Sequence, residues 1–353
     1  MSPASFIGIQ GENIISFGSG EPDLPPPDSV FKILPHYTNF KYGLIQGQEK
    51  LRNALSKQYP DSSAENFVIT NGASEALDLT LRVIALDDNH LAKKVLIPKP
   101  YYYSYPRIVE LIGLEPIYLN THEGLIDLED FRKKVTDCRA VIINSPSNPT
   151  GRVESIDTLK EIELLTNQYG IYVLSDEVYK DLMYVRNNYL IKGPHVVTIN
   201  SFSKTYAMCG FRVGYLWAHD STLIQKIIAM KTHTSMNTNI LGQAMAYEAT
   251  KVPQSFLDKQ LMIWKERRDL LFNGLEEMGL KLWNPEGAFY MLPEIDNAED
   301  FVWDMYTKFN LISYLGDWFG APGRVRFSYA LSTEKIKEGL FRMNDYLNSK
   351  RVA

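Results

Sequence analysis

The chain has 353 residues, 45% of them hydrophobic, and a formal net charge of −5. That length allows a sizeable core and about two domains, or one large domain with a smaller satellite. The mildly acidic balance argues against a general affinity for nucleic acid or anionic membranes. Only two cysteines, Cys138 and Cys209, are present, which favours reduced thiols over a disulfide framework.

Neither a targeting segment nor a membrane span is expected. Residues 1–16 lack a basic segment followed by an apolar block, as a signal peptide would have. No uninterrupted apolar run approaches the ~20 residues needed to cross a bilayer. We therefore expect a cytoplasmic protein with neither a membrane nor a nucleic-acid partner.

Gly and Pro are frequent in residues 17–47, which predicts an extended, irregular segment. Short apolar runs then alternate with helical patterns, such as 74–84 and 156–169, which predicts an α/β fold with a mostly parallel sheet and helices on both faces. The predicted strands are 67–70, 94–97, 115–119, 140–143, 171–174 and 196–199. In such sheets ligands bind at the carboxyl ends of the strands.

The C-terminal third has a different pattern. A long helical region is predicted at about 223–280, and residues 281–353 mix short strands with a final helix at 333–348. We interpret this last part as a smaller α+β domain.

The segment Ser201-Phe-Ser203-Lys204, followed by Arg212, carries the strongest chemical signal, at the end of the apolar run 195–200. A lysine can form a Schiff base with an aldehyde, and hydroxyls with a guanidinium can hold a phosphate. Pyridoxal phosphate has both groups. The alternatives are a surface lysine or the Ser-x-x-Lys motif of serine acyl enzymes, but the Lys-Thr-Gly partner of that motif is missing.

Two further strand ends carry polar residues. The turn 71–76 contains Gly72 and opens a predicted helix, so its amides could bind an anion, although such turns are common. Asp176 ends a buried strand, and Tyr179 follows it. A carboxylate at that depth needs a charged partner, such as a protonated pyridine nitrogen, unless Asp176 is only a helix N-cap.

The remaining signals are individually modest. Asn148 lies in a rigid Pro- and Gly-containing turn, which is either functional or an ordinary turn. One tyrosine of the run 101–105 could stack on a planar ring, or the tyrosines could belong to the core. Arg326 lies on a predicted strand and could clamp a carboxylate by two parallel hydrogen bonds, or face solvent.

As an ordered set, these motifs resemble the class I/II aminotransferases of the fold-type-I pyridoxal-phosphate-dependent superfamily, near the aspartate aminotransferase subgroup. The resemblance covers about 20–348. It rests on Gly20-Glu-Pro-Asp23, Tyr42-Gly, the 71–76 turn, Pro98-x-Pro-x-Tyr-x-x-Tyr105, Asn148-Pro-Thr-Gly, Asp176-Glu-Val-Tyr179, Ser201-x-Ser-Lys204 with Arg212-x-Gly-Tyr215, Glu286-Gly-Ala-Phe-Tyr290 and Val325-Arg-Phe-Ser-Tyr-Ala.

The resemblance implies roles for individual residues. Lys204 would form the internal aldimine with the cofactor and later move the proton between Cα and the cofactor. Asp176 would pair with the pyridine nitrogen, Tyr179 and Asn148 would bind the phenolic oxygen, and Tyr102 would stack on the ring. The phosphate would be held by Gly72, Ala73, Ser74, Ser201, Ser203 and Arg212.

Substrate binding and assembly follow from the same resemblance. Arg326 and Asn148, with backbone near Gly20, would bind the substrate α-carboxylate. Tyr42 would reach the phosphate of the neighbouring subunit, which implies a homodimer. No metal site is expected. The implied domains are a large cofactor-binding domain, 39–265, and a small domain formed by 1–38 and 266–353.

The chain departs from the family pattern in its short N-terminal segment and in its charges. Relatives that act on acidic substrates need a second cation, for which Arg107, Lys41 and Lys99 are candidates. Glu110 falls where some of those relatives carry lysine. The tyrosines Tyr101, Tyr103 and Tyr105 would also suit an aromatic donor.

The predicted function is a pyridoxal-phosphate-dependent aminotransferase that moves an amino group from an L-amino acid to a 2-oxo acid by a ping-pong route. The alternative is another reaction of the same cofactor, such as β-elimination, decarboxylation, racemisation or oxidation. A regulator that keeps the fold would need an N-terminal DNA-binding module, for which residues 1–16 are too short.

Overall fold

The computed structural model describes residues 9, 11, 13–87 and 92–352. Its strands are β1 (Ile15–Ser16), β2 (Phe67–Thr70), β3 (Lys94–Pro98), β4 (Glu115–Leu119), β5 (Thr121–His122), β6 (Leu125–Ile126), β7 (Cys138–Asn144), β8 (Tyr172–Asp176), β9 (Val196–Ser201), β10 (Gly214–Trp217), β11 (Tyr290–Met291), β12 (Leu311–Ile312), β13 (Tyr314–Leu315) and β14 (Val325–Ser328). Its α-helices are α1 (Glu49–Ser56), α2 (Ala73–Ala85), α3 (Ser104–Leu111), α4 (Leu128–Lys134), α5 (Ile156–Tyr169), α6 (Phe202–Thr205), α7 (Ser221–Thr234), α8 (Ile240–Ala249), α9 (Gln254–Glu277), α10 (Ala298–Phe309) and α11 (Thr333–Val352). The 3₁₀ helices are η2 (Asp28–His36), η3 (Ala64–Asn66), η4 (Val135–Asp137), η5 (Cys209–Phe211) and η6 (Gly316–Phe319).

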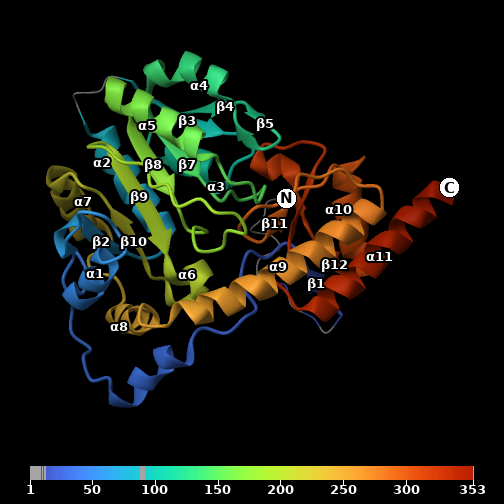
Figure 1. The fold of residues 1–353 in the computed structure, drawn as a ribbon, viewed down its shortest axis with the longest axis horizontal. Helices are drawn as coiled ribbons and strands as arrows, with labels where there is room; N and C mark the ends of the chain where they lie inside the picture. Colours follow the sequence, from blue (N-terminus) through green and yellow to red (C-terminus); the bar gives the residue numbers. More distant parts are fainter. Residues whose placement is uncertain (1–8, 10, 12, 88–91, 353) are drawn as a thin grey trace.

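A seven-stranded sheet with the order β2-β10-β9-β8-β7-β3-β4 forms the centre of the larger part (Figure 1). Strands β9, β8, β7, β3 and β4 are parallel to one another, whereas β10 is antiparallel to both of its neighbours. The prediction of a mostly parallel α/β sheet is therefore confirmed. Because the parallel strands run in one direction, their carboxyl ends meet at one edge.

Helices cover both faces of this sheet because its inner strands are apolar on both sides. In β7, Ala140 and Ile142 pack towards helices α2, α3 and α7, while Val141 and Ile143 pack towards α4 and α5. This alternation is the period-two geometry of a strand. Beside α4 and α5, helices α1 and α8 cover β2 and β10 in a further apolar cluster.

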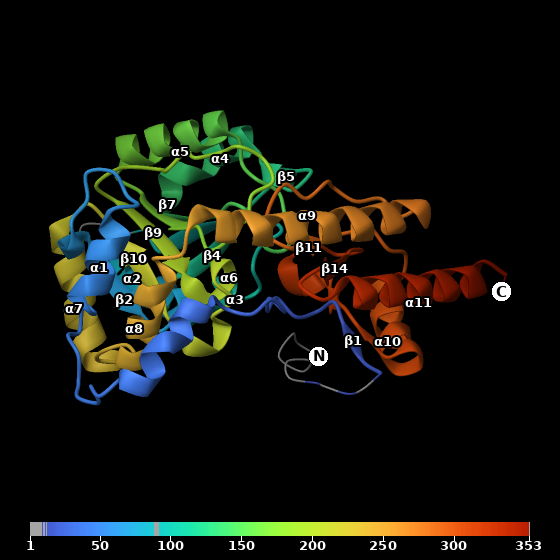
Figure 2. The ribbon, with the colours of Figure 1, turned by 60° about the horizontal axis from the view of Figure 1, so that its bottom comes forward.

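The C-terminal part has its own core, built around the antiparallel strands β11, β14 and β13 and helices α9, α10 and α11. β1 joins it by pairing with β12 in parallel. Helix α9 runs from the sheet to this second part, and the two parts lie side by side in both views (Figures 1 and 2).

The predicted elements differ from the observed ones mainly at their ends. The strand predicted at 140–143 extends over Cys138–Asn144, and the one at 171–174 runs over Tyr172–Asp176. The helical region predicted at 223–280 is three helices, because α8 begins at an Asn239 N-cap and α9 begins after Pro253. Proline is well suited to this flanking position because it lacks the N–H that a helix interior needs.

The helix η2 lies within residues 1–38, which are predicted to belong to the small domain. Val30 of this helix packs in the same apolar cluster as Leu51 and Met245, on the sheet side of the molecule. No helix among the described residues is long and apolar enough to cross a membrane.

Candidate functional site

A cavity of about 600 Å³ opens at the carboxyl edge of the sheet, between the two parts of the chain. Three neighbouring parallel strands end in it, β7 at Asn144, β8 at Asp176 and β9 at Ser201. The C-terminal part contributes Arg326 from β14. The sheet edge and the C-terminal part therefore together bring residues far apart in the sequence into one site.

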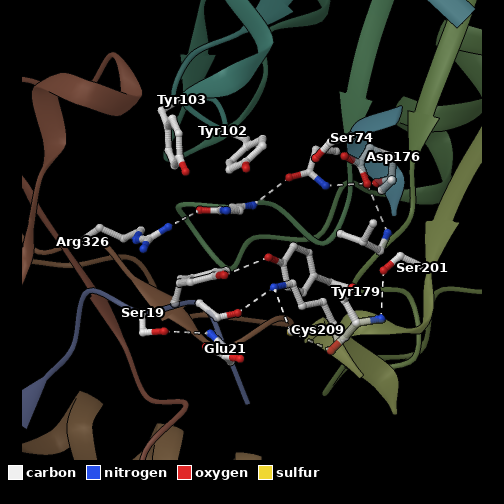
Figure 3. A pocket seen from close by; sticks show the side chains of 18 of the residues that line it. Ser19, Glu21, Ser74, Tyr102, Tyr103, Asp176, Tyr179, Ser201, Cys209 and Arg326 are labelled. Atoms are coloured by element: carbon white, nitrogen blue, oxygen red, sulfur yellow. Dashed lines mark hydrogen bonds between the residues drawn. The ribbon is translucent and has the colours of Figure 1, made fainter. Parts of the chain in front are cut away.

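Most of the predicted site residues line this cavity. Those that do are Gly20, Ala73, Ser74, Tyr102, Asn148, Asp176, Tyr179, Ser201, Ser203, Lys204, Arg212 and Arg326. Gly72 lies just behind the lining, as the N-cap of α2. Figure 3 shows Asp176 and Ser74 at one end of the cavity and Arg326 and Tyr103 at the other.

Lys204 lies on the short helix α6, directly after β9, and its amine faces the cavity. Ser201 caps this helix by accepting a hydrogen bond from the Ser203 amide (2.9 Å). The Lys204 Nζ donates to the carbonyl oxygen of Gly20 (2.7 Å) and lies 3.8 Å from the Cys209 sulfur. Both of these hydrogen-bond partners of the amine are neutral groups.

Asp176 is a buried carboxylate, 4% exposed, at the end of β8. Its Oδ2 accepts a hydrogen bond from the Tyr105 hydroxyl (2.6 Å), and its Oδ1 accepts one from the Val178 amide (3.3 Å). Burial raises the pKa of Asp176 to about 6. No salt bridge within the described residues includes it, so a cationic ligand group would restore the charge balance.

A positive charge, the Arg326 guanidinium, is buried at the other end of the cavity. Arg326 is 2% exposed and donates to Asn148 Oδ1 (2.9 Å) and to the carbonyl oxygen of Gly18. The rings of Tyr290 and Tyr314 surround its guanidinium, with Cζ 4.5 and 4.8 Å from their centroids. Its Nε has no hydrogen-bond partner and no carboxylate of the described chain pairs with it, which leaves it ready for an anion.

A second candidate anion-binding site, besides Arg326, lies at the N-terminus of α2. This helix has no side-chain cap, and its first residues, Ala73 and Ser74, line the cavity. Gly72 has φ +78°, and a Cβ there would lie 2.4 Å from Arg212 Nη2. Only glycine therefore lets the guanidinium approach the turn so closely. Helix amides, hydroxyls and an arginine together suit a phosphate.

The Glu75 carboxylate holds the turn before α2 in place through hydrogen bonds. It accepts hydrogen bonds from the Asn71 amide (2.6 Å) and side chain, and its charge is neutralised by Lys231 (2.8 Å). Lys231 is fully buried on α7 and also bonds Ser235.

Aromatic rings complete the lining. The Tyr179 hydroxyl shares a hydrogen bond with the Tyr290 hydroxyl (2.8 Å), and burial raises the pKa of Tyr179 well above its ordinary value. Tyr102 extends into the cavity beside Tyr103, with ring centroids 4.7 Å apart (Figure 3). Its flat ring could cover a planar ligand.

Two predictions have no support inside this single chain. Tyr42 is 84% exposed and does not line the cavity. None of the candidate second cations lines it either. Arg107 pairs with Glu110 (2.7 Å), and the Lys99 ammonium lies 4.2 Å above the ring of Tyr118.

The residues fit pyridoxal phosphate. The α2 N-terminus and Arg212 suit its phosphate, the buried Asp176 suits a protonated ring nitrogen, and the Lys204 amine suits its aldehyde. The charges of the site, one buried carboxylate and one buried guanidinium at opposite ends, match a cationic ring and an anionic substrate. This donor set defines a pyridoxal-phosphate enzyme.

Comparisons with known proteins give the family. The model of the family "Aminotransferase class I and II" matches residues 12–342. An aspartate aminotransferase from Bacillus sp. (strain YM-2) is 30% identical over 375 residues, covering 98% of this chain and 94% of the relative. Aromatic-amino-acid aminotransferase 2 from Thermococcus litoralis is 31% identical over 377 residues, again covering 98% and 94%.

A solved structure agrees. The aspartate aminotransferase of Thermus thermophilus with maleate superposes with a TM-score of 0.89 at 27% identity, covering 94% of this chain and 91% of that one. The chain belongs to the class I and II aminotransferase family. It is a pyridoxal-phosphate-dependent aminotransferase of fold type I, and the ping-pong route is general for this family.

Sequence reasoning missed several lining residues. Tyr290 stood in a quoted motif without a site role, and Tyr314 was not singled out at all. Tyr105 was expected to suit an aromatic donor, and its hydrogen bond to Asp176 was not foreseen. Cys209 and Glu21 also line the cavity. Only the Tyr105 spacing, within one turn of Tyr102, offered a signal for its contact with the site.

Proposed function

We propose that Lys204 is the catalytic lysine of this aminotransferase and that the residues around it have the roles the sequence predicts. The observation that supports the proposal is the presence of two buried charged side chains in the cavity. Among the described residues, neither the buried Asp176 nor the buried Arg326 takes part in a salt bridge, and both line the cavity together with Lys204. Buried charges require partners, and here the partners are the cofactor ring and the substrate carboxylate.

When bound, pyridoxal phosphate supplies an aldehyde carbon that joins to amines and an electron-withdrawing ring that weakens bonds at the substrate Cα. Asp176 keeps the ring nitrogen protonated, and Tyr179 with Asn148 orients the ring through its phenolic oxygen. Ala73, Ser74, Ser201, Ser203 and Arg212 bind the phosphate, with Gly72 allowing their close approach.

The substrate is oriented by its α-carboxylate. Arg326 offers its guanidinium and Asn148 its side-chain amide, beside the backbone near Gly20. Lys204 Nζ, which faces the cavity, would take the proton from the substrate Cα and hold it. Its present acceptor, the Gly20 carbonyl, keeps the amine within the cavity rather than in solvent.

A homodimer completes the site in this proposal. The segment 31–44 exposes Phe31, Leu34, Phe40, Tyr42 and Leu44. An apolar run of this kind is typical of a surface covered by a partner. Tyr42 would then reach the phosphate of the neighbouring site. Sedimentation should give a dimer, and Tyr42→Phe should weaken cofactor binding without changing the mass; a monomer would contradict this assembly.

Two further proposals concern the cellular location and the domain division. The cytoplasmic assignment rests on the two free cysteines, Cys138 and Cys209. The domain division, a large domain of 39–265 with a small domain of 1–38 and 266–353, is supported by the separate C-terminal core, with Val30 favouring a boundary before η2.

The experiment follows the visible absorbance of the holoenzyme as single L-amino acids are added, and then a 2-oxo acid. A spectral change reversed by the 2-oxo acid is expected, with the amino group recovered in the new amino acid. Lys204→Ala should abolish turnover, while Lys226→Ala, an exposed lysine on α7, should not. Full activity of Lys204→Ala would refute the assignment, and release of ammonia or CO₂ would indicate a different reaction.

A further inference from the structure

One wall of the cavity is apolar and aromatic. Ile9, Tyr103 and Tyr314 line it, and all three belong to an apolar cluster with Ile312 and Phe319. Tyr103 packs edge-on against Phe319, with ring centroids 5.8 Å apart. The wall is therefore held by packing behind it rather than by a flexible surface chain.

This wall lies at the Arg326 end of the cavity. The Tyr314 ring centroid is 4.8 Å from the Arg326 Cζ, and Figure 3 draws Tyr103 on the same side of the cavity as Arg326, away from Ser74. A substrate whose carboxylate binds Arg326 and whose reacting carbon faces Lys204 has little other lining left for its side chain. That lining is the aromatic wall and the serines Ser16 and Ser19.

The charged residues that line the cavity also favour a substrate with an uncharged side chain. Among the described residues, the cations that line the cavity are Lys204, Arg212 and Arg326, and each already has a role in the proposed function. The other charged lining residues, Asp176 and Glu21, are carboxylates. A second carboxylate on a substrate would therefore meet no further cation among the described residues that line the cavity.

We propose that the cavity selects amino acids with an aromatic side chain and that Tyr103 and Tyr314 form the subsite for it. This proposal rests on the proposed function, since it uses Arg326 and Lys204 to orient the substrate. Aromatic rings bury a large area and gain from edge-to-face contacts with other rings. A cavity of about 600 Å³ also has the size of a typical small-molecule site.

Tyr103 is a better position than Tyr314 for a substitution that tests the subsite. Tyr314 packs against Gly18, where a Cβ would lie 2.3 Å from its Cε1, and it contacts Arg326, so its loss would also disturb carboxylate binding. The Tyr103 ring packs against Tyr102 and Phe319, whereas the rings against the Arg326 guanidinium are those of Tyr290, Tyr314 and Phe319. Its replacement should therefore change the side-chain preference more than the chemistry.

The test measures kcat/KM of the holoenzyme for L-phenylalanine, L-tyrosine, L-aspartate and L-alanine with a common 2-oxo acid. The aromatic donors should be preferred over L-aspartate by more than tenfold. Tyr103→Ala should lower kcat/KM for L-phenylalanine by roughly tenfold, since one aromatic contact is lost, with little change for L-alanine. Tyr169→Ala, the same substitution at an exposed site on α5, should change neither value.

Binding gives a readout that does not depend on turnover. The carboxylates 3-phenylpropanoate and succinate lack the amino group, and calorimetry on the holoenzyme should find the aromatic one tighter. Tyr103→Phe keeps the ring and should keep this preference. It also serves as the folded variant if Tyr103→Ala proves unstable.

The outcomes separate the two proposals. A preference for L-aspartate, or equal rates for all donors, would overturn the aromatic subsite while leaving the aminotransferase intact. L-aspartate activity that disappears in Lys41→Ala would overturn it too, by revealing a cation from the 31–44 segment of a second copy. Absence of conversion with every amino acid would instead overturn the proposed roles of Lys204 and Arg326.

Discussion

Removal of one hydroxyl, in Tyr105→Phe, should move the ionisation of Asp176. The Tyr105 hydroxyl donates to Asp176 Oδ2 at 2.6 Å, and both side chains are buried, 3% and 4% exposed. Burial raises the pKa of Asp176 to about 6, and this hydrogen bond opposes the rise. A hydrogen bond to a charged group contributes about 1.5–3 kcal/mol, so its loss should raise this pKa further by about 1 to 2.

The sign of the stability change follows from proton binding. In the apoprotein the pKa of Asp176 lies above its unfolded value, so the folded state binds the proton more readily. Stability therefore falls as pH rises from about 4 to about 6 and is level above that. In Tyr105→Phe the fall should continue to roughly pH 7–8, so the gap between variant and wild type widens over that range and then stays constant.

The assay is thermal unfolding of the apoproteins at pH 5.5, 6.5 and 8, with pyridoxal phosphate affinity measured at the same pH values. Affinity of the variant should fall most near pH 6.5, because a neutral Asp176 cannot pair with a cationic ring. Tyr169→Phe removes an exposed hydroxyl and is the control. A stability gap that is absent, or the same at every pH, would refute the reasoning.

Two further predictions concern the turn that opens α2. Lys231→Met should destabilise the protein by about 1–3 kcal/mol in urea unfolding, because it leaves the half-buried Glu75 carboxylate without its counter-ion. Adding Glu75→Gln should recover most of the loss, and a cost below about 0.5 kcal/mol would contradict this account. Gly72→Ala should weaken pyridoxal phosphate binding about tenfold or more by displacing Arg212. Gly113→Ala is its matched control, because Gly113 has a similar φ of +81° with open space around it, and equal loss of affinity in both variants would rule out the displacement.

The sequence was informative wherever a signal is local. Strand-helix alternation predicted the sheet, because a buried parallel strand must be apolar throughout and must end in turn residues. The same logic placed Asp176 and Ser201 at strand ends, where parallel strands bring them to one edge. The lysine motif with Arg212 was equally local, since both residues lie within one turn and the next segment.

The sequence predicted less where a contact depends on packing between distant segments. The bond between Arg326 and Asn148 joins residues 178 positions apart, and that between Tyr179 and Tyr290 joins residues 111 apart. Neither spacing leaves a periodic trace in the chain. The proposed role of Tyr42 depends on a second subunit, and within the single chain its side chain is 84% exposed.

By itself, then, the sequence determined the fold class and the chemical groups at the strand ends, because both follow from hydrophobic period and turn chemistry. Only the tertiary structure decided which of those groups face one another. The uncompensated burial of Asp176 and Arg326, and the aromatic wall of Tyr103 and Tyr314, arise where the C-terminal part packs against the sheet edge. Burial and charge pairing are properties of three-dimensional neighbours, and these neighbours come from segments far apart in the chain.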